Sequence, residues 1–235
     1  MKVRIKFTKE GTAKFVGHLD TMRYFQKALR RAGLPVAFSG GYSPHMIMSF
    51  AAPLGVGTTS LGEYFDLELT ETVPTAVIEE QLNSTMAEGI RVVSVCAVED
   101  GKASKAMALV AAADYLVEFR DGKEPEAPWK DKISEFYGLP SISVIKKTKR
   151  SEKEVDIRPF IYEMELQDGK VFLKLASASA NYTKPELVMD TFQNWLGCEP
   201  KPFCYQVQRL EVYADTGSEE KHIFVPLEAL GEKVE

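Results

Sequence analysis

Cysteine and histidine are scarce in this sequence, with three of each among 235 residues. Cys96, Cys198 and Cys204 are widely spaced and odd in number, which is typical of free thiols in a reducing compartment rather than of a disulfide framework. No apolar run approaches the ~20 residues that a membrane-spanning helix needs. The first residues alternate charged and apolar side chains and lack the apolar stretch of a signal peptide. We therefore expect a cytoplasmic protein with no membrane segment.

The short motifs that mark many metal and nucleotide sites are also absent. Neither HxH, HxxxH nor HExxH occurs, and there is no CxxxCxxC run that could hold an iron–sulfur cluster in the radical-SAM manner. Segment 54–60 is rich in glycine and hydroxyl groups but lacks the Lys-Ser/Thr of a phosphate-binding loop, and no GxSxG motif exists. His18, His45 and Asp20 could ligate a metal, but their spacing matches no such motif. We expect no intrinsic cofactor and no metal.

What the sequence does have is a strong charge asymmetry. Residues 1–50 contain nine Lys or Arg and two acids, whereas residues 51–100 contain one base and nine acids, in a chain of net charge -5. A basic first quarter indicates an anionic partner for that region. Pairing of the basic and acidic regions within the fold is the alternative, and the sequence does not separate the two.

The apolar periodicity of residues 1–100 predicts a βαββαβ order. Strands are predicted over 2–7, 46–50, 63–69 and 90–98, and helices over 19–32 and 74–87. Gly33 and Pro35 end the first of these helices. This order is typical of a ferredoxin-like unit.

A similar order recurs in the second half, without visible sequence identity between the halves. Residues 101–113 are expected to form a linker, residues 114–214 a second ferredoxin-like unit with an added hairpin at Asp168-Gly169, and residues 215–235 a partly mobile tail. Strands are predicted over 115–119, 141–147, 161–166, 171–175 and 205–213, and helices over 129–136 and 185–196. The sequence therefore predicts an α+β protein of two ferredoxin-like units with antiparallel sheets, packed side by side.

The first predicted helix carries a basic row opposite its apolar stripe. Arg23, Lys27 and Arg30 recur at i, i+4 and i+7, with Arg31 beside them. Like charges at this spacing repel one another by ~0.2–0.5 kcal/mol per pair, so helix stability does not explain the row. We expect the row to contact phosphates of RNA or another anion, and the alternatives are a solvated face and pairing with the acids that follow in the sequence.

Two histidines and an aromatic residue flank this helix. His18 lies at its start beside Asp20, and His45 follows loop 39–44, in which Tyr42 offers a ring for stacking. If the strand, helix and loop pack as a split βαβ unit, His18 and His45 could converge at one sheet edge. They are the candidate catalytic residues, and with Asp20 and Tyr42 they are candidate anion contacts.

A secondary cluster lies in the second half. Lys149 and Arg150 belong to a basic stretch that is followed by Asp156 and Arg158, and Arg209 lies in the last predicted strand. A flexible basic loop suits an RNA or protein partner, and a solvated loop is the alternative.

Several of these motifs together resemble the radical-SAM-linked protein family of bacteria, whose members occur alone or fused to a radical-SAM protein. The resemblance spans about residues 1–213 and rests on five runs: F-x-G-H-L-D-x-M-R-x-x-x-x-A-L-R-R-A-G-L-P (15–35), G-Y-S-P-H (41–45), P-L-G-V-G (53–57), E-Y-F-D (63–66) and E-V-D-I-R-P (154–159). The chain resembles the stand-alone form, with Gly17 where the family usually has Ser and Tyr42-Ser43 where it often has Phe-Asn. The resemblance implies association with a radical-SAM enzyme, which would carry S-adenosylmethionine and an iron–sulfur cluster, and it supplies no catalytic set.

The sequence leaves three functions open. We favour a non-catalytic accessory protein that docks an anionic substrate, with RNA as the preferred ligand, or a radical-SAM partner enzyme. The first alternative is an enzyme similar to the metal-independent endoribonucleases that process CRISPR repeats, with His18 or His45 as general base, although their C-terminal glycine-rich motif is absent. The second alternative is a protein–protein scaffold.

Overall fold

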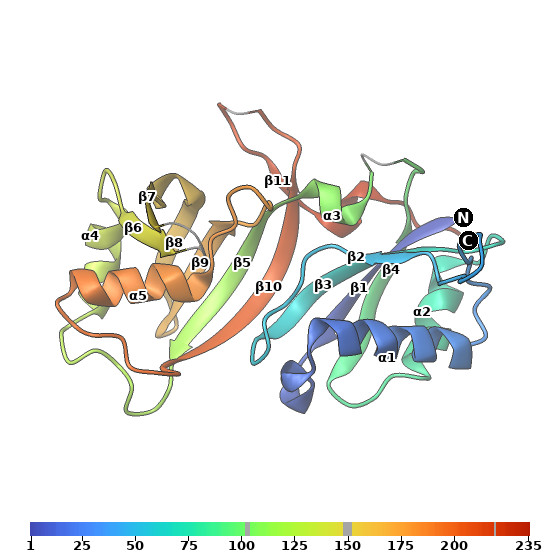
Figure 1. The fold of residues 1–235 in the computed structure, drawn as a ribbon, viewed down its shortest axis with the longest axis horizontal. Coiled ribbons are helices and arrows are strands. Elements are labelled where there is room, and N and C mark those ends of the chain that lie inside the picture. Colours follow the sequence, from blue (N-terminus) through green and yellow to red (C-terminus); the bar gives the residue numbers. More distant parts are fainter. Residues whose placement is uncertain (102–103, 148–151, 219) are drawn as a thin grey trace. The chain divides into compact units, whose positions relative to one another are not determined.

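The computed structural model describes residues 1–101, 104–147, 152–218 and 220–235. The chain forms two compact units: unit 1 comprises Met1–Ala111 with Arg209–Glu235, and unit 2 comprises Ala112–Gln208. Both combine antiparallel strands with a few helices, so the chain is a mixed α+β protein (Figure 1). No helix in these described ranges is long and apolar enough to cross a membrane.

Unit 1 is a sheet with α1 and α2 packed on one face. Its elements are β1 (Lys2–Lys9), η1 (Gly11–Phe15), α1 (His18–Arg31), β2 (Met48–Phe50), β3 (Thr59–Glu68), α2 (Thr75–Asn83), β4 (Ile90–Ala97), α3 (Ala106–Leu109), residues 209–215 of β10 (Tyr205–Asp215), β11 (Phe224–Pro226) and η4 (Leu227–Leu230). The strand order is β4-β1-β3, with β2 and β10 also pairing with β3. The β1–β3, β1–β4 and β2–β3 pairs are antiparallel.

The core of unit 1 lies between this sheet and the two helices. Alternate residues of β1, namely Val3, Ile5 and Phe7, are buried in the core, as the alternation of the sequence predicts. Phe25 of α1 packs against Phe7, with ring centroids 4.6 Å apart, and against Phe65 of β3, at 4.8 Å. These contacts hold one face of α1 on the sheet and leave the opposite face toward solvent.

Helix α1 lies within one residue of its predicted bounds at each end. Its N-cap residue, Gly17, provides no side-chain cap, and the Gly17 carbonyl accepts the Thr21 N–H at 2.9 Å. At the C-terminus Gly33 adopts a φ of 68°, and its N–H donates to the Arg30 carbonyl at 3.2 Å. This turn leads the chain through Pro35 into the segment that precedes β2.

Unit 2 is a second antiparallel sheet with helices and an extra hairpin. Its elements are β5 (Val110–Phe119, from residue 112), η2 (Lys130–Lys132), α4 (Ile133–Tyr137), β6 (Ser143–Lys147), β7 (Glu152–Asp156), η3 (Arg158–Phe160), β8 (Ile161–Gln167), β9 (Lys170–Ala176), α5 (Pro185–Trp195) and residues 205–208 of β10. The strand order is β10-β5-β9-β8, and β6 pairs with β7. Asp168 and Gly169 both have positive φ, 48° and 83°, and form the predicted β8–β9 turn.

The structure departs from the sequence prediction mainly outside the long periodic segments. The segment expected to be a linker contains α3 and the first residues of β5, and the helix predicted over 129–136 is a 3-10 turn followed by the five-residue α4. The C-terminal segment, expected to be partly mobile, packs on unit 1: Leu227 is fully buried, and Glu232 pairs with Ala97. Burial of the Leu227 side chain in the core holds this segment in place, although most of its residues are polar.

Candidate anion-binding surface

Helix α1 presents its basic row to solvent. Phe25 and Leu29 are fully buried on its core side, so residues on the opposite side of the 3.6-residue repeat face outward. Arg23, Lys27 and Arg30 lie on that side and are all exposed, the Arg23 side chain by 68%. The row predicted from the sequence is therefore accessible to a ligand along its length.

Most of this row is not neutralised within the fold. Arg23 pairs with Asp20 on the same helix, with Nη1 3.1 Å from Oδ1, and both side chains are exposed. Arg31 Nη2 donates to the Thr85 carbonyl at 3.0 Å. Lys27 and Arg30 have no ion-pair partner among the described residues, and no described acid of region 51–100 pairs with the row. The internal pairing left open by the sequence is thus not seen for this helix.

His18, the first residue of α1, lies against the core rather than over the basic row. Its ring packs edge-on to Phe50, with centroids 5.4 Å apart, and it is half-buried. It lines a cavity of about 10 Å³ together with the buried residues Lys9 and Glu63. A space of this size holds at most about one water molecule.

The charges beside this cavity form a buried ion pair. Arg209 Nη1 donates to both carboxylate oxygens of Glu63 at 3.1 Å, and its Nη2 donates to the Pro53 carbonyl at 3.3 Å. Burial raises the pKa of Glu63 despite the Arg209 charge. Burial lowers the pKa of Lys9, whose Nζ donates to the Val16 carbonyl at 2.6 Å. Arg209 was predicted to belong to the basic cluster of the second half, but it is a buried partner of Glu63 in unit 1.

Loop 39–45 presents an aromatic ring and a histidine at the surface. Ser39 Oγ lies 2.9 Å from Nδ1 of His45 and accepts the His45 backbone N–H at 3.1 Å. The Ser39 N–H donates to the His45 carbonyl at 2.9 Å, which closes the loop. Tyr42 is fully exposed between them. Its ring is available for stacking on a flat ligand.

The two candidate catalytic histidines lie in different surroundings. His18 packs on Phe50, whereas His45 packs on Ser39. They line separate cavities that have no lining residue in common. His18 thus lies at the N-terminus of the basic helix and His45 in the exposed loop, and the two do not form the shared site that the sequence left open.

The secondary cluster of the second half is largely structural where it is described. Asp156 accepts the N–H groups of Ile142 and Arg158 at 2.8 and 2.9 Å, and these hydrogen bonds lower its pKa. The Arg158 guanidinium stacks on the Tyr137 ring at 4.2 Å and donates to the Ile161 carbonyl at 3.0 Å. These contacts join the β6–β7 hairpin to α4 and β8. Lys149 and Arg150 lie outside the described residues.

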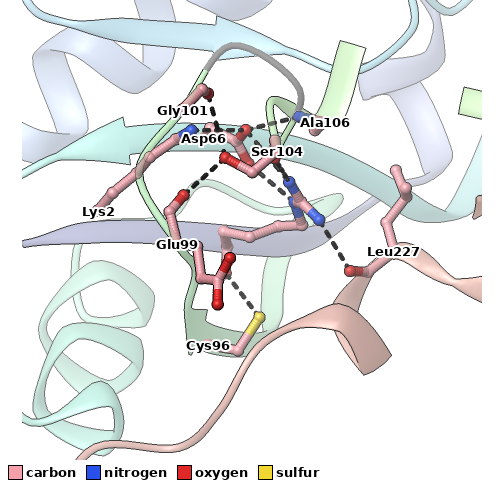
Figure 2. Close-up of polar contacts among 9 residues, drawn as sticks. Lys2, Asp66, Cys96, Glu99, Gly101, Ser104, Ala106 and Leu227 are labelled. Atoms are coloured by element: carbon pink, nitrogen blue, oxygen red, sulfur yellow. Dashed lines mark hydrogen bonds and ion pairs between the residues drawn. The ribbon is translucent and has the colours of Figure 1, made fainter. Parts of the chain in front are cut away.

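The buried polar face of the unit 1 sheet was not predicted from the sequence. Lys2, Arg4 and Lys6 alternate with the core residues of β1 and lie on the face away from α1 and α2, yet all three are largely buried. Arg4 Nε donates to Asp66 Oδ1 at 2.8 Å, and Arg4 also donates to the Leu227 and Ser104 carbonyls (Figure 2). The sequence shows only that charged and apolar residues alternate along β1, and in such a strand the charged side chains normally face water.

Lys6 occupies the centre of a second buried group on this face. Its Nζ lies 2.6 Å from a carboxylate oxygen of Glu211 and 2.6 Å from one of Glu228. Burial by itself would lower the pKa of Lys6, but the two carboxylates outweigh it and the pKa is raised. The Tyr64 hydroxyl donates to Glu211 at 2.6 Å; burial and this carboxylate raise its pKa. Glu211 belongs to β10 of the sheet itself, whereas Glu228 lies in η4, so its contact with Lys6 holds the C-terminal segment on the sheet.

The fold and the surface together define a mixed α+β protein with a solvent-facing basic helix. Comparison with known families shows that the chain belongs to the family described as uncharacterized protein conserved in bacteria (DUF2344), which matches residues 2–185. No curated protein matches the chain. Among solved structures, a chain of the "Crystal Structure of a Cbf5-Nop10-Gar1 Complex" is similar at 13% sequence identity and a TM-score of 0.46, over 89% of this chain and 48% of that one. This chain spans about half the length of that solved chain.

Proposed function

We propose that the chain is a non-catalytic accessory protein that binds RNA through α1 and loop 39–45. The observation that carries this proposal is the exposed row of Arg23, Lys27 and Arg30, which the rest of the described chain leaves largely unpaired. Basic side chains that face solvent without acidic partners are the means by which proteins contact phosphates.

The dimensions of the row suit a nucleic-acid strand. Arg30 lies seven positions after Arg23 in the helix, a rise of about 10 Å. Three cations over that length can contact several phosphates of one strand. Tyr42 supplies an exposed ring of the kind on which unpaired bases stack, so charge and stacking are both available on unit 1.

The proposed partner is a radical-SAM enzyme, which would hold S-adenosylmethionine and the iron–sulfur cluster. This part of the proposal rests on the motif runs of the sequence, including residues 15–35, 41–45 and 53–57. We further propose a cytoplasmic location. The strand orders β4-β1-β3-β2 and β10-β5-β9-β8 support reading each unit as ferredoxin-like, an architecture that serves as an RNA-binding scaffold elsewhere.

The test is binding of total cellular RNA at ~50 and ~200 mM salt, the range over which phosphate contacts lose affinity. Wild type is compared with R23E/R30E and with K130E/K201E, a matched reversal of two exposed lysines in unit 2. We expect salt-sensitive binding that R23E/R30E abolishes and K130E/K201E retains. Absence of RNA binding by the wild type would overturn the RNA proposal and leave the scaffold alternative, to be tested by a pull-down with a radical-SAM protein.

A second candidate function is RNA cleavage at His18. The observation in its favour is that His18 lines the same small cavity as Glu63 and Lys9, two buried groups whose pKa values are shifted in opposite directions. If the protein is such an enzyme, the wild type is expected to cleave RNA and His18→Ala is expected not to. His45, which lines a different cavity, is tested in parallel with His45→Ala, and intact RNA in all three reactions rejects the enzyme.

A further inference from the structure

A cavity of about 130 Å³ lies on the polar side of the unit 1 sheet, beyond the surface described so far. It is bounded by strands β1, β2 and β3, by the end of loop 39–45 and by the residue before α3. Its polar lining consists of Lys2, His45, Ser49, Asp66, Glu68 and Lys105.

The strand register explains why these side chains meet. Lys2 of β1 lies opposite Glu68 of β3, and Ser49 of β2 lies opposite Asp66. Opposite residues of antiparallel strands share a face, so all four lie on the side of the sheet away from α1 and α2. Lys105 directly follows Ser104, whose carbonyl accepts a hydrogen bond from Arg4 on that same side.

Lys2 is the unusual member of this group. The residue is only 6% exposed, and its ammonium comes no closer than 4.0 Å to a carboxylate oxygen, that of Asp66 (Figure 2). No described residue accepts a hydrogen bond from it. An ammonium group has three donors, and those of Lys2 are turned to the cavity rather than to acceptors of the protein.

Asp66 lies too far from Lys2 to accept its hydrogen bond, because 4.0 Å separate Nζ from Oδ2, and the carboxylate is instead held by other donors. Its Oδ1 accepts from Arg4 Nε at 2.8 Å, and its Oδ2 accepts from Arg4 Nη2 at 3.3 Å and from the Ala106 N–H at 2.7 Å. Lys6, four residues along the same strand face, provides the contrast, because two carboxylates lie 2.6 Å from its Nζ. The same strand thus carries one lysine with two carboxylates in close contact and one with only a 4.0 Å ion pair.

We propose that the cavity binds a single phosphate group, with the Lys2 ammonium in its lining as the principal donor. Lys105, Ser49 and His45 line the same space and can supply further donors. Arg4 balances the charge of Asp66, so Lys2 and Lys105 together exceed Glu68 by one positive charge. The site therefore attracts an anion electrostatically and offers hydrogen-bond donors to the oxygens of the phosphate.

This inference deepens the proposed function in one respect. His45 closes the loop proposed to hold RNA, so the phosphate would be that of an RNA end, and a small phosphorylated molecule is the other source of the same chemistry. The choice of RNA rests on the proposed function, whereas the binding of a phosphate group does not.

The first experiment measures thermal unfolding of the full chain with and without inorganic phosphate. The variants are Lys2→Met, which removes the charge and keeps the length of the side chain, and R23E/R30E, which alters only the α1 row. Because Lys2 makes no hydrogen bond, Lys2→Met is expected to unfold no earlier than wild type in phosphate-free buffer. Phosphate is expected to raise the Tm of wild type and R23E/R30E equally and to leave Lys2→Met unchanged.

Titration calorimetry with inorganic phosphate gives the size of the effect. The Kd is expected to rise about tenfold or more in Lys2→Met, and Lys105→Ala and Ser49→Ala, which leave the core intact, are expected to weaken binding by smaller factors. No binding by wild type, or the same Kd and Tm shift in Lys2→Met, overturns the proposal. The variants at 105 and 49 keep it testable if Lys2→Met does not fold.

The second experiment identifies the source of the phosphate. Short oligoribonucleotides with a 5′-phosphate and with a 5′-hydroxyl are compared on wild type and Lys2→Met. A preference for the 5′-phosphate that disappears in Lys2→Met assigns the site to an RNA end. Phosphate binding without RNA binding retains the site, assigns it to a small molecule and rejects the proposed function. Loss of inorganic phosphate binding with RNA binding intact rejects the site alone.

Discussion

Arg4 and Asp66 form an ion pair across β1 and β3, with Nε 2.8 Å from Oδ1 and side chains only 1% and 3% exposed. The pair lies on the sheet face opposite α1 and α2, where Ala106 and Leu227 complete its hydrogen bonds. It therefore joins three distant parts of unit 1: the central strands, the segment at α3 and the C-terminal segment. A buried pair of this kind is costly to break because either partner alone is an uncompensated charge.

Asp66→Asn is expected to destabilise the protein by about 3–5 kcal/mol, since it leaves the Arg4 guanidinium buried without a counter-charge. The double variant Arg4→Met/Asp66→Leu removes both charges and is expected to lose less stability than Asp66→Asn alone. Urea unfolding, followed by circular dichroism, measures the free energy of unfolding of the wild type and of both variants. A double variant less stable than the single one would show that the pair contributes net stability of its own.

The acid limb of the stability profile is expected to depend on Glu228. Burial opposes ionisation of this carboxyl, but hydrogen bonds from Lys6 and Ser94 outweigh it and lower its pKa below 4.5. A carboxyl whose folded-state pKa is depressed adds stability above its unfolded pKa, and this contribution is lost as the pH falls through the folded value. Glu228→Gln is therefore expected to show a smaller loss of Tm than wild type between neutral pH and pH values below 4.5.

The control for this profile is Glu88→Gln, a change at an exposed carboxylate. Lys6 affects stability at alkaline pH instead. Its pKa is raised in the folded state, so its contribution to stability is fully present below 10.5 and is lost as the pH rises through the folded-state pKa. A Glu228→Gln profile parallel to wild type in acid would show that Glu228 does not stabilise unit 1 through its charge.

The salt dependence of RNA binding is expected to report the number of phosphates that α1 contacts. Each contact to a single strand contributes ~0.7 to the slope of log K against log salt, so R23A/R30A is expected to reduce the slope by about 1.4. Fluorescence anisotropy of a labelled oligoribonucleotide at several salt concentrations measures it. K130A/K201A should retain the wild-type slope; an equal change in both variants would mean that overall charge, and not α1, controls binding.

Tyr42→Ala is expected to weaken RNA binding through the loss of one stacked base, by about 1–3 kcal/mol. Because the ring is fully exposed, its removal should leave the Tm unchanged. Tyr42→Phe retains the ring and should bind like wild type. Unchanged affinity in Tyr42→Ala would remove loop 39–45 from the RNA-binding surface and leave α1 to act alone.

Helices and strands with a long side-chain repeat could be predicted from the amino-acid sequence alone. The apolar stripe that includes Phe25 and Leu29 located α1 to within one residue, and the alternation of Val3, Ile5 and Phe7 located β1 and its core face. The outward position of Arg23, Lys27 and Arg30 followed from the same periodicity. Periodicity is local, so a single chain is enough to predict it.

The burial of polar residues and the identity of their partners could not be predicted from the sequence, because both depend on the packing of distant segments. Lys2, Arg4 and Lys6 read as a solvated strand face, but Glu228, more than 200 positions along the chain, and Asp66 bring acceptors to two of them. His18 and His45 lie only 27 positions apart, yet they line different cavities. Contacts between distant segments depend on how strands pair and segments pack, and no local pattern of residues encodes those distances.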